Sequence, residues 1–357
     1  MNVKIHSSEL GRMMRVLSSC IGLKDTKFSN VEISHENNLF SIRATNGSHF
    51  VKMSTPLLGG DGESFCVDGK MFGNVISKAN GEVSIDTNGN VCVIKANGRT
   101  RIPIVNDSLP IPEPINGKSV SVQAADFISV SERVRYAAGT DENRLILTGI
   151  LTETYGNELT MVALDGFQMA IESSVCEGED IKIVIPNILL KRICDCAGPE
   201  EDIKIVTDGK RVCLSTDTSE VIGSLLAGEY IDYQRLIPES FATKVLFSIE
   251  SMKDALKGSS VVGNAKNLVK FIVHGDKLTI TSNSEEAEFD ADIECRTEGN
   301  DLTIAFNDRY VLNALNAVSG EEAILNLGTA VSPAVIRERT ENGVKTGIHL
   351  VLPVRVM

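Results

Sequence analysis

The chain has 357 residues, of which 42% are hydrophobic and 23% charged, so it has enough apolar surface to build folded cores and is not a disordered chain. Its net charge of −13 argues against a protein that holds nucleic acid over a broadly positive surface, because such binding depends on neutralising phosphates. No apolar run approaches the roughly 18 residues of a membrane span, and the polar start argues against a secretion signal, so a cytoplasmic protein is expected. The eight scattered cysteines are expected to be small core residues.

The first third of the chain predicts alternating strands and two amphipathic helices. In chain order the expected elements are strand 3–6, helix 7–20, strand 65–67, helix 69–79, and the hairpin strands 83–86 and 91–95, with further alternating strands between the first helix and strand 65–67. The helices are predicted from apolar residues that recur at helical spacing. The hairpin is predicted from Asn88-Gly89-Asn90, because its glycine supplies the positive φ that a tight turn requires.

The same order of elements returns twice more. The expected elements are strand 120–122, helix 124–138, strand 181–185, helix 186–197 and hairpin strands 203–206 and 211–215; then strand 245–249, helix 250–259, strand 302–306 and helix 307–318. Prolines at 110, 112 and 114, and again at 238, forbid regular structure between the repeats. We therefore expect three domains, 1–117, 118–240 and 241–357. One large irregular α+β protein is the alternative.

No segment of the sequence predicts a catalytic site, a metal site or a cofactor. The five histidines are isolated, and none has the spacing of a metal ligand pair. Cys194 and Cys196 lie two residues apart on a predicted helix, where their side chains diverge. The segment 59–62 is rich in glycine but lacks the Lys-Ser/Thr of a phosphate-binding loop. An enzyme whose site assembles from distant residues remains an alternative.

Charge is distributed unevenly between the six predicted helices and the rest of the chain. The helices together carry +3, which leaves −16 on the other residues. This separation suits a ring whose helices face a polyanion and whose sheets face solvent, although scatter among six short segments is the alternative. Such a weakly basic lining would hold DNA loosely and would permit sliding.

Motifs in all three thirds resemble one known family. Segments 144–151 and 162–170 are similar to the family's Leu-x-Gly and Thr-Asp-Gly-His-Arg-Leu-Ala, and 228–238 to its Gly-x-Phe-Pro-Asp-Tyr-x-Arg-Val-x-Pro. The last third contributes Phe306-Asn307 with Tyr310, and 350–356 resembles the family's Met-Pro-Met-Arg-Leu ending. On these segments the chain resembles the bacterial sliding clamp, the beta subunit of DNA polymerase III.

The resemblance implies an α+β fold of three repeated clamp domains, each with two helices packed on antiparallel sheets. Two chains would join head to tail as a homodimer, giving a six-domain ring around duplex DNA that is read without regard to sequence. The ring would be a non-enzymatic processivity factor that tethers the replicative polymerase. Its expected protein partners are the alpha subunit of DNA polymerase III and the clamp-loader subunits, with no membrane and no cofactor. A divergent clamp paralogue that acts mainly as a peptide-binding protein is the alternative.

The family resemblance also implies a pocket for partner peptides that contain Gln and Leu or Phe. The matching positions here are Leu147, Leu164, Gly166, Phe167, Gln168, Met169, Arg235, Leu236, Tyr310, Val331, Leu350, Val351, Leu352, Pro353, Val354 and Arg355. Phe167 and Gln168 stand where the family has His-Arg, and Leu164 stands where it has Thr. We therefore expect a more apolar and less positive pocket, with a different or weaker peptide preference.

Two further sets of residues follow from the resemblance and the helix positions. Ile102, Ile104, Val261 and Val262 match the family's dimer interface, with core packing as the alternative for all four. Lys24 matches a basic loop residue that faces DNA. The helix candidates for phosphate contact are Arg12, Arg15, Lys70, Lys78, Lys191, Arg192, Lys253 and Lys257.

Overall fold

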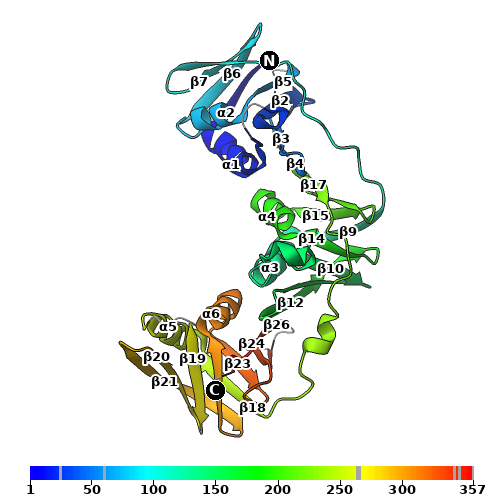
Figure 1. Ribbon diagram of the computed structural model, residues 1–357. Coiled ribbons are helices and arrows are strands. Elements are labelled where there is room, and N and C mark those ends of the chain that lie inside the picture. The colour runs from blue at the N-terminus through cyan, green and yellow to red at the C-terminus, as the bar shows by residue number, and fades with distance from the viewer. Residues whose placement is uncertain (24–25, 59–61, 263–266, 341–342, 345–346, 356–357) are drawn as a thin grey trace. The chain divides into compact units, whose positions relative to one another are not determined.

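The computed structural model describes residues 1–23, 26–58, 62–262, 267–340, 343–344 and 347–355 (Figure 1). Within these ranges six α-helices and their strands follow one order three times: strand, helix, four strands, helix, three strands, with two additional two-residue strands. The α+β class predicted from the sequence is confirmed, and so are the six helices.

The elements of each repeat have the following bounds. The first contains β1 (Asn2–His6), α1 (Ser7–Leu17), β2 (Asn30–Glu36), β3 (Leu39–Thr45), β4 (His49–Pro56), β5 (Gly62–Asp68), α2 (Gly69–Ile76), β6 (Glu82–Asn88), β7 (Val91–Lys95) and β8 (Arg99–Pro103). The second contains β9 (Lys118–Gln123), α3 (Ala124–Arg135), β10 (Gly149–Tyr155), β11 (Glu158–Leu164), β12 (Gln168–Val175), β13 (Glu177–Gly178), β14 (Lys182–Pro186), α4 (Asn187–Cys196), β15 (Asp202–Thr207), β16 (Arg211–Ser215) and β17 (Ser219–Ser224). The third contains β18 (Thr243–Ser248), α5 (Ile249–Ser260), β19 (Leu268–His274), β20 (Lys277–Asn283), β21 (Glu288–Gly299), β22 (Leu302–Asn307), α6 (Asp308–Ala317), β23 (Glu322–Leu327), β24 (Ala334–Thr340), β25 (Gly343–Val344) and β26 (Ile348–Val351). Short 3-10 segments lie at Ser18–Cys20 (η1), Lys27–Ser29 (η2), Glu142–Thr148 (η3) and Tyr233–Leu236 (η4).

Contacts divide the chain into two compact units. Unit 1 comprises Met1–Ile128 and Cys176–Leu226, and unit 2 comprises Ser129–Val175 and Ala227–Met357. The middle third of the sequence therefore contributes to both units.

Unit 1 contains two antiparallel sheets. One has the order β1-β6-β7-β8, and the other has the order β13-β9-β15-β16-β17-β4-β3-β2-β5. The pairing of β17 with β4 carries the second sheet from the middle third of the chain into the first, with Val221 opposite Val51. Helices α1 and α2 lie side by side (Figure 1), and they bury Leu10, Met13 and Phe72 completely.

Unit 2 is built on one continuous antiparallel path. Its order runs β10-β11-β12-β26-β24-β23-β18-β21-β20-β19-β22. Strand β26 pairs with β12, which places His349 opposite Ala170. In the core, the rings of Phe271 and Phe306 meet edge to face with their centroids 5.2 Å apart. Burying one such side chain stabilises the fold by roughly 1.5–3 kcal/mol.

Local chemistry explains where the helices and hairpins begin and end. The Asp68 carboxylate accepts the N–H of Met71 at 2.7 Å and so caps α2. Helix α1 ends at Leu17 and continues as a 3-10 turn, so it is shorter than the predicted 7–20. Gly89 and Gly209 have φ of 58° and 83°, as the two predicted hairpin turns require.

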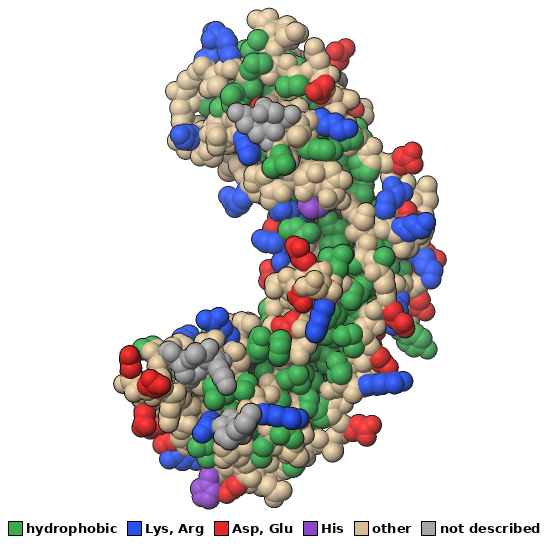
Figure 2. Space-filling view, viewed as in Figure 1, with side chains coloured by type: hydrophobic (Ala, Val, Ile, Leu, Met, Phe, Trp, Pro, Cys, Tyr) green, Lys and Arg blue, Asp and Glu red, His purple; other side chains and the backbone are tan. Residues whose placement is uncertain are grey.

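The surface carries charge unevenly. Acidic side chains gather over the β20–β21 hairpin (Figure 2). In β21 the exposed residues Glu288, Asp290, Asp292 and Glu294 alternate with less exposed ones. None of the described helices is long and apolar enough to cross a membrane.

Candidate functional site

A cavity of about 470 Å³ in unit 2 brings together segments that are far apart in sequence. Its wall comes from the residues that follow α3, from η3, from the turn before β12 and from α6. Four predicted pocket residues line it: Leu147, Phe167, Gln168 and Tyr310. The cavity is therefore the candidate site.

The turn before β12 fixes the direction of Phe167. One carboxylate oxygen of Asp165 accepts the backbone N–H groups of Phe167 at 2.7 Å and of Gln168 at 2.9 Å. Gly166, between Asp165 and Phe167, has φ of 96°, a conformation that favours glycine. Phe167 is thereby held outward, 58% exposed, with its ring stacked on that of Tyr310 at 5.8 Å and 8°. The two rings form an aromatic wall.

Gln168 lies under this wall and is almost fully buried. Its amide nitrogen donates to Asp165 at 3.0 Å and to the carbonyl of Tyr136 at 3.4 Å, while its oxygen accepts from Asn313 at 3.5 Å. Gln168 is thus a neutral amide that satisfies the neighbouring polar groups without adding charge.

Tyr136 connects the cavity to a buried ionic cluster. Its hydroxyl lies 3.0 Å from Nδ1 of His349, and the two rings stack with centroids 6.0 Å apart. Burial raises the pKa of the Tyr136 phenol above its ordinary range, and the nearby carboxylates Glu172 and Asp165 add to this effect. The phenol is therefore neutral at physiological pH.

The ionic cluster joins α3 and β12 to β24 and β26. Arg133 lies 2.7 Å from Glu172 and 3.0 Å from Glu338, and Nε2 of His349 lies 3.2 Å from Glu172. The side chains of all four are at most 11% exposed. Buried charges are tolerated only when they are paired, so this cluster fixes the strands beside the cavity in one arrangement.

Four predicted pocket residues belong to the core and not to the lining. Leu164, Met169, Leu350 and Val351 are at most 3% exposed. Met169 pairs with Leu350 in the sheet, and Gln168 pairs with Val351. Consecutive strand residues point to opposite faces, so the burial of all four shows that this strand pair is covered on both faces. The prediction placed these residues in the pocket because a family match gives a position along the chain and not its exposure.

The other predicted pocket residues lie at the surface of unit 2. Arg235 and Leu236 are on η4, where Arg235 pairs with Asp232 at 2.8 Å. Leu352 is held beside Phe167 because its N–H donates to the Phe167 carbonyl at 2.9 Å. Val331, Pro353, Val354 and Arg355 are exposed or half-buried, and none of them is among the residues that line the cavity.

The sequence prediction missed several residues that form the wall. Tyr136, Asp141, Arg144 and Asp165 line the cavity, and none was assigned to the pocket. Asp165 carried a usable signal, because an Asp-Gly pair after a strand predicts a turn whose carboxylate bonds backbone N–H groups. Tyr136 carried no such signal, because it follows the end of α3 and the apolar periodicity of a helix does not show what the residue after it contacts.

The helix cations occupy several kinds of position. Arg15, Lys70 and Lys78 are exposed, Lys191 and Lys257 are exposed and paired with Asp195 and Asp254, and Lys253 is half-buried. Burial and the neighbouring Lys257 lower the pKa of Lys253. Arg12 donates to Glu9 and to the Cys196 carbonyl. Lys24 lies outside the described residues.

The predicted phosphate contact of Arg192 is wrong, because this side chain is buried. It is 7% exposed, and its guanidinium donates to the carbonyl of Ser19 at 3.3 Å. Helix α1 covers this face of α4, so the side chain stabilises helix packing and offers no surface to a ligand.

The predicted interface residues also differ in exposure. Ile102 is 1% exposed and faces the core of its own repeat, which makes the alternative of core packing correct for this residue. Ile104 and Val262 are half-buried, whereas Val261 is 85% exposed.

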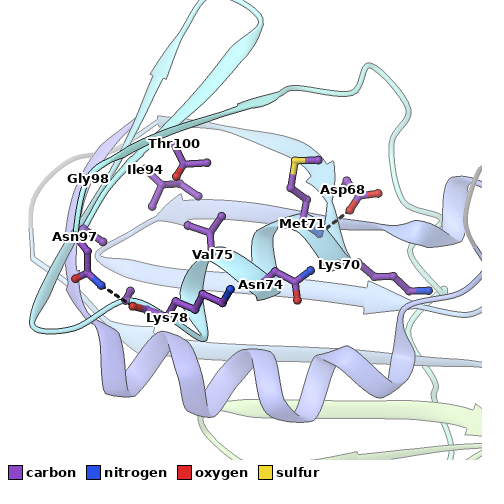
Figure 3. A pocket seen from close by; sticks show the side chains of 12 residues that line it. Asp68, Lys70, Met71, Asn74, Val75, Lys78, Ile94, Asn97, Gly98 and Thr100 are labelled. Carbon is purple, nitrogen blue, oxygen red and sulfur yellow. Dashed lines mark hydrogen bonds between the residues drawn. The ribbon is translucent and has the colours of Figure 1, made fainter.

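A second hollow lies between α2 and the β7–β8 hairpin of unit 1. It has a volume of about 570 Å³, and Met71, Val75, Ile94 and Thr100 form its apolar part (Figure 3). Lys70 and Lys78 lie at its edge (Figure 3). This hollow is named the α2 groove.

Comparison with known proteins gives one consistent family. The profile of the DNA polymerase III beta subunit central domain matches residues 121–232, and that of its C-terminal domain matches residues 234–355. The chain is 26% identical to the beta sliding clamp of Lactococcus lactis over 98% of both chains, and 25% identical to that of Staphylococcus aureus over 82% of this chain and 80% of the other.

Solved structures agree with this assignment. The beta subunit from Thermotoga maritima matches with a TM-score of 0.89 at 26% identity, and the clamp from Pseudomonas aeruginosa bound to griselimycin matches with a TM-score of 0.92 at 19% identity. Both comparisons cover 100% of each chain, although the second, at its low identity, shows the fold alone. The chain therefore belongs to the family of DNA polymerase III beta subunits, the bacterial sliding clamps.

Proposed function

We propose that this sliding clamp carries its partners, the polymerase alpha subunit and the clamp loader, through a short peptide that enters the cavity beside Phe167. The observation that carries the proposal is the aromatic wall of Phe167 and Tyr310 over a buried amide, Gln168. Large apolar side chains of a peptide bind such a hollow by leaving water, and a few polar groups fix their orientation.

The lining of the proposed site carries few charges and an exposed aromatic ring. Asp165 is engaged by the amide of Gln168, and Arg144 is the cation among the lining residues. Phe167 is exposed before any peptide binds, so contact with a peptide ring or leucine would bury apolar area. We expect the preferred peptide to differ from the family norm, because His-Arg is replaced here by Phe-Gln.

A calorimetric peptide titration tests the pocket. With a peptide that contains Gln, Leu and Phe, Phe167→Ala is expected to raise the dissociation constant roughly tenfold, because an anchor contact of about 1.4 kcal/mol is lost. The control is Tyr155→Ala, which removes another exposed aromatic ring of unit 2; Tyr155 is the last residue of β10, is 88% exposed and is not among the lining residues.

Equal binding by wild type and Phe167→Ala would place the peptide elsewhere. Ordinary affinity of wild type for a peptide of the usual family sequence would contradict the altered preference while leaving the pocket itself in place.

We further propose that two copies close head to tail as a homodimeric ring on duplex DNA in the cytoplasm, and that the ring tethers without a reaction of its own. The repeats support this assembly, because the last strands of the second and third repeats, β17 and β26, each pair with a strand of another repeat. The exposed helix cations Arg15, Lys191 and Lys257 would supply weak phosphate contacts that permit sliding.

A further inference from the structure

The joint between the first and second repeats is built like the joint beside the cavity at Phe167. Strand β17 pairs with β4 in unit 1, and β26 pairs with β12 in unit 2. Gly223 lies opposite His49 in the first joint, and Val351 lies opposite Gln168 in the second. In both joints the strand that receives its partner, β4 or β12, follows a tight turn. The two joints can therefore be compared residue by residue.

The two turns have the same hydrogen bonds. In the turn before β4, Oδ1 of Asn46 accepts the backbone N–H groups of Ser48 and His49, both at 3.0 Å. In the turn before β12, Oδ1 of Asp165 accepts the backbone N–H groups of the residues two and three positions later, at 2.7 and 2.9 Å. Gly47 has φ of 91°, and the glycine after Asp165 has φ of 96°. Asn46 is therefore equivalent to Asp165.

A hollow of about 320 Å³ lies beside the turn before β4. Its wall comes from this turn, from η2, from the ends of β16 and β17 and from the linker that follows β8. Its volume is at the lower end of the range of ligand pockets, roughly 300–1,000 Å³. This hollow, with Lys27, Phe28, His49, residues 110–112 and Arg211 in its wall, is named the joint hollow.

The aromatic ring of the joint hollow comes from a different element than the ring of the cavity. Ser48 stands at the position of Phe167, and the ring here belongs to Phe28 of η2, which is half-buried. Phe28 packs on the turn, because a Cβ atom at Gly47 would fall 3.2 Å from its ring. Ile111 of the linker is 57% exposed in the same wall. An apolar ligand side chain would therefore remove apolar area from water at this place.

The joint hollow differs from the cavity in charge. Among the described residues, its wall contains the cations Lys27 and Arg211 and no carboxylate. The cavity is lined by two carboxylates, Asp141 and Asp165, and by one cation, Arg144. A positive hollow on a chain of net charge −13 favours an acidic ligand.

The turn itself accounts for part of this difference. Asn46 is neutral where Asp165 is charged, and its amide nitrogen lies 3.0 Å from Nε2 of His49. Burial lowers the pKa of His49, and the nearby Arg192 adds to the effect. The imidazole is therefore neutral at neutral pH and accepts the amide N–H of Asn46. The turn thus adds no charge of its own to the hollow.

Arg211 holds the linker at the hollow and keeps donors for a ligand. Its Nη1 donates to the carbonyl of Glu113 at 3.3 Å, and its Nε donates to Asp208 at 3.1 Å. A guanidinium has five N–H donors, so others remain for a ligand carboxylate. Asp208 partly offsets the charge of Arg211. The exposed Lys27, whose Nζ lies 5.4 Å from the centre of the Phe28 ring, is therefore the stronger attraction for a carboxylate.

We propose that the joint hollow is a second peptide site of the clamp, which binds an acidic segment of a partner protein through one or two large apolar side chains. The apolar side chains would cover Phe28 and Ile111, and the flanking carboxylates would pair with Lys27 and Arg211. A DNA backbone fits less well, because it brings charge without an apolar side chain to cover Ile111. The inference goes beyond the function proposed above, since it concerns another site and a peptide of another charge.

Fluorescence polarisation of the labelled peptide Asp-Glu-Leu-Phe-Glu-Asp with the 357-residue chain tests this second site. Lys27→Glu is expected to raise the dissociation constant roughly tenfold at low salt, because an attraction becomes a repulsion. Ile111→Ser is expected to raise it roughly fivefold, because an apolar contact is lost. The charge-matched control is Lys204→Glu, which reverses an exposed lysine of β15 outside the wall of the hollow and is expected to leave binding unchanged.

Two further peptides separate the apolar contribution from the charge. Lys-Lys-Leu-Phe-Lys-Lys and Asp-Glu-Ser-Ser-Glu-Asp are each expected to bind roughly tenfold more weakly than the acidic Leu-Phe peptide. Equal binding of the Ser-Ser peptide would make the hollow a site for any anion and would overturn the peptide site. Circular dichroism of each variant checks that it folds.

Phe167→Ala separates the two sites. It is expected to leave binding of the acidic peptide unchanged while it weakens binding of the peptide that contains Gln, Leu and Phe. Loss of the acidic peptide in Phe167→Ala and not in Lys27→Glu would place it in the cavity and overturn the second site, as would a wild-type chain that does not bind it. A wild-type chain that binds the acidic peptide alone would contradict the function proposed above and support the joint hollow.

Discussion

Single residues beside the cavity show how long-range contacts limit substitution. Glu172 accepts from Arg133 at 2.7 Å and lies next to Gly347, where a Cβ atom would fall 2.4 Å from the carboxylate. The glycine is thus required by close approach, since any side chain would push Glu172 out of the buried ion pair.

Gly347→Ala is expected to lower the free energy of unfolding by about 2 to 4 kcal/mol, because overpacking and a disturbed buried pair both destabilise. Urea unfolding followed by circular dichroism measures it. Gly11→Ala in α1 is the matched control, since its Cβ would meet nothing within 4 Å, and it is expected to be neutral or slightly stabilising. Equal stability of the two variants would show that the ion pair tolerates displacement.

Residue exposure was the weakest part of the sequence prediction. Leu164 and Met169 match the family's pocket positions, but in the folded chain they lie beneath the cavity. Arg192 is a charged residue of a type that usually lies at the surface, yet α1 covers it. In each case the neighbour that buries the side chain is distant in sequence, so no local pattern announces it.

Whole elements were predicted more reliably, because their signals are local. The helices follow from apolar residues at a 3.6-residue period, and their starts follow from caps such as Asp68 and Asn307. The last strand of each repeat was harder to predict, since β8, β17 and β26 are only four to six residues long. The role of β17 and β26 in joining repeats appears only when the pairings are known.

The hydrogen bond from Met71 to Asp68 at the start of α2 can be tested by substitution. Asp68→Ala is expected to cost about 1 kcal/mol of unfolding free energy, since the N–H of Met71 loses its acceptor. Asp68→Asn keeps an acceptor oxygen and is expected to lose much less. Differential scanning calorimetry of both variants measures the difference, and equal losses would mean that the charge of Asp68, and not its hydrogen bond, stabilises the helix.

Edge chemistry also explains why β8 does not pair indiscriminately. Its exposed Arg99 and Arg101, together with Pro103 at its end, are features that protect free strand edges from aggregation.

For the whole molecule, the net charge of −13 has to be reconciled with a DNA partner. Retention by encirclement resolves the conflict, because a closed ring stays on its track without tight contact. Two of the predicted cations, Arg12 and Arg192, are engaged in bonds within unit 1, which weakens the direct grip further.

Encirclement predicts how the clamp is retained on DNA of different topology. After loading, the clamp is expected to remain on nicked circular DNA when the salt is raised from 0.1 to 1 M, and to leave linear DNA of the same length, as measured by gel filtration of the complex. High salt screens phosphate contacts but cannot undo topological linkage. Loss from circles and linear DNA at the same salt concentration would contradict encirclement.

The sequence by itself determined the repeated order of elements, the hairpin turns and the family, because periodicity, turn chemistry and motifs are properties of neighbouring residues. Only the tertiary structure decided which side chains face water, how Tyr136, Phe167 and Tyr310 meet at one cavity, and which of the described strands pair with one another. Those features depend on pairings between residues up to about two hundred positions apart, such as Tyr136 with His349, whose energies no local pattern encodes.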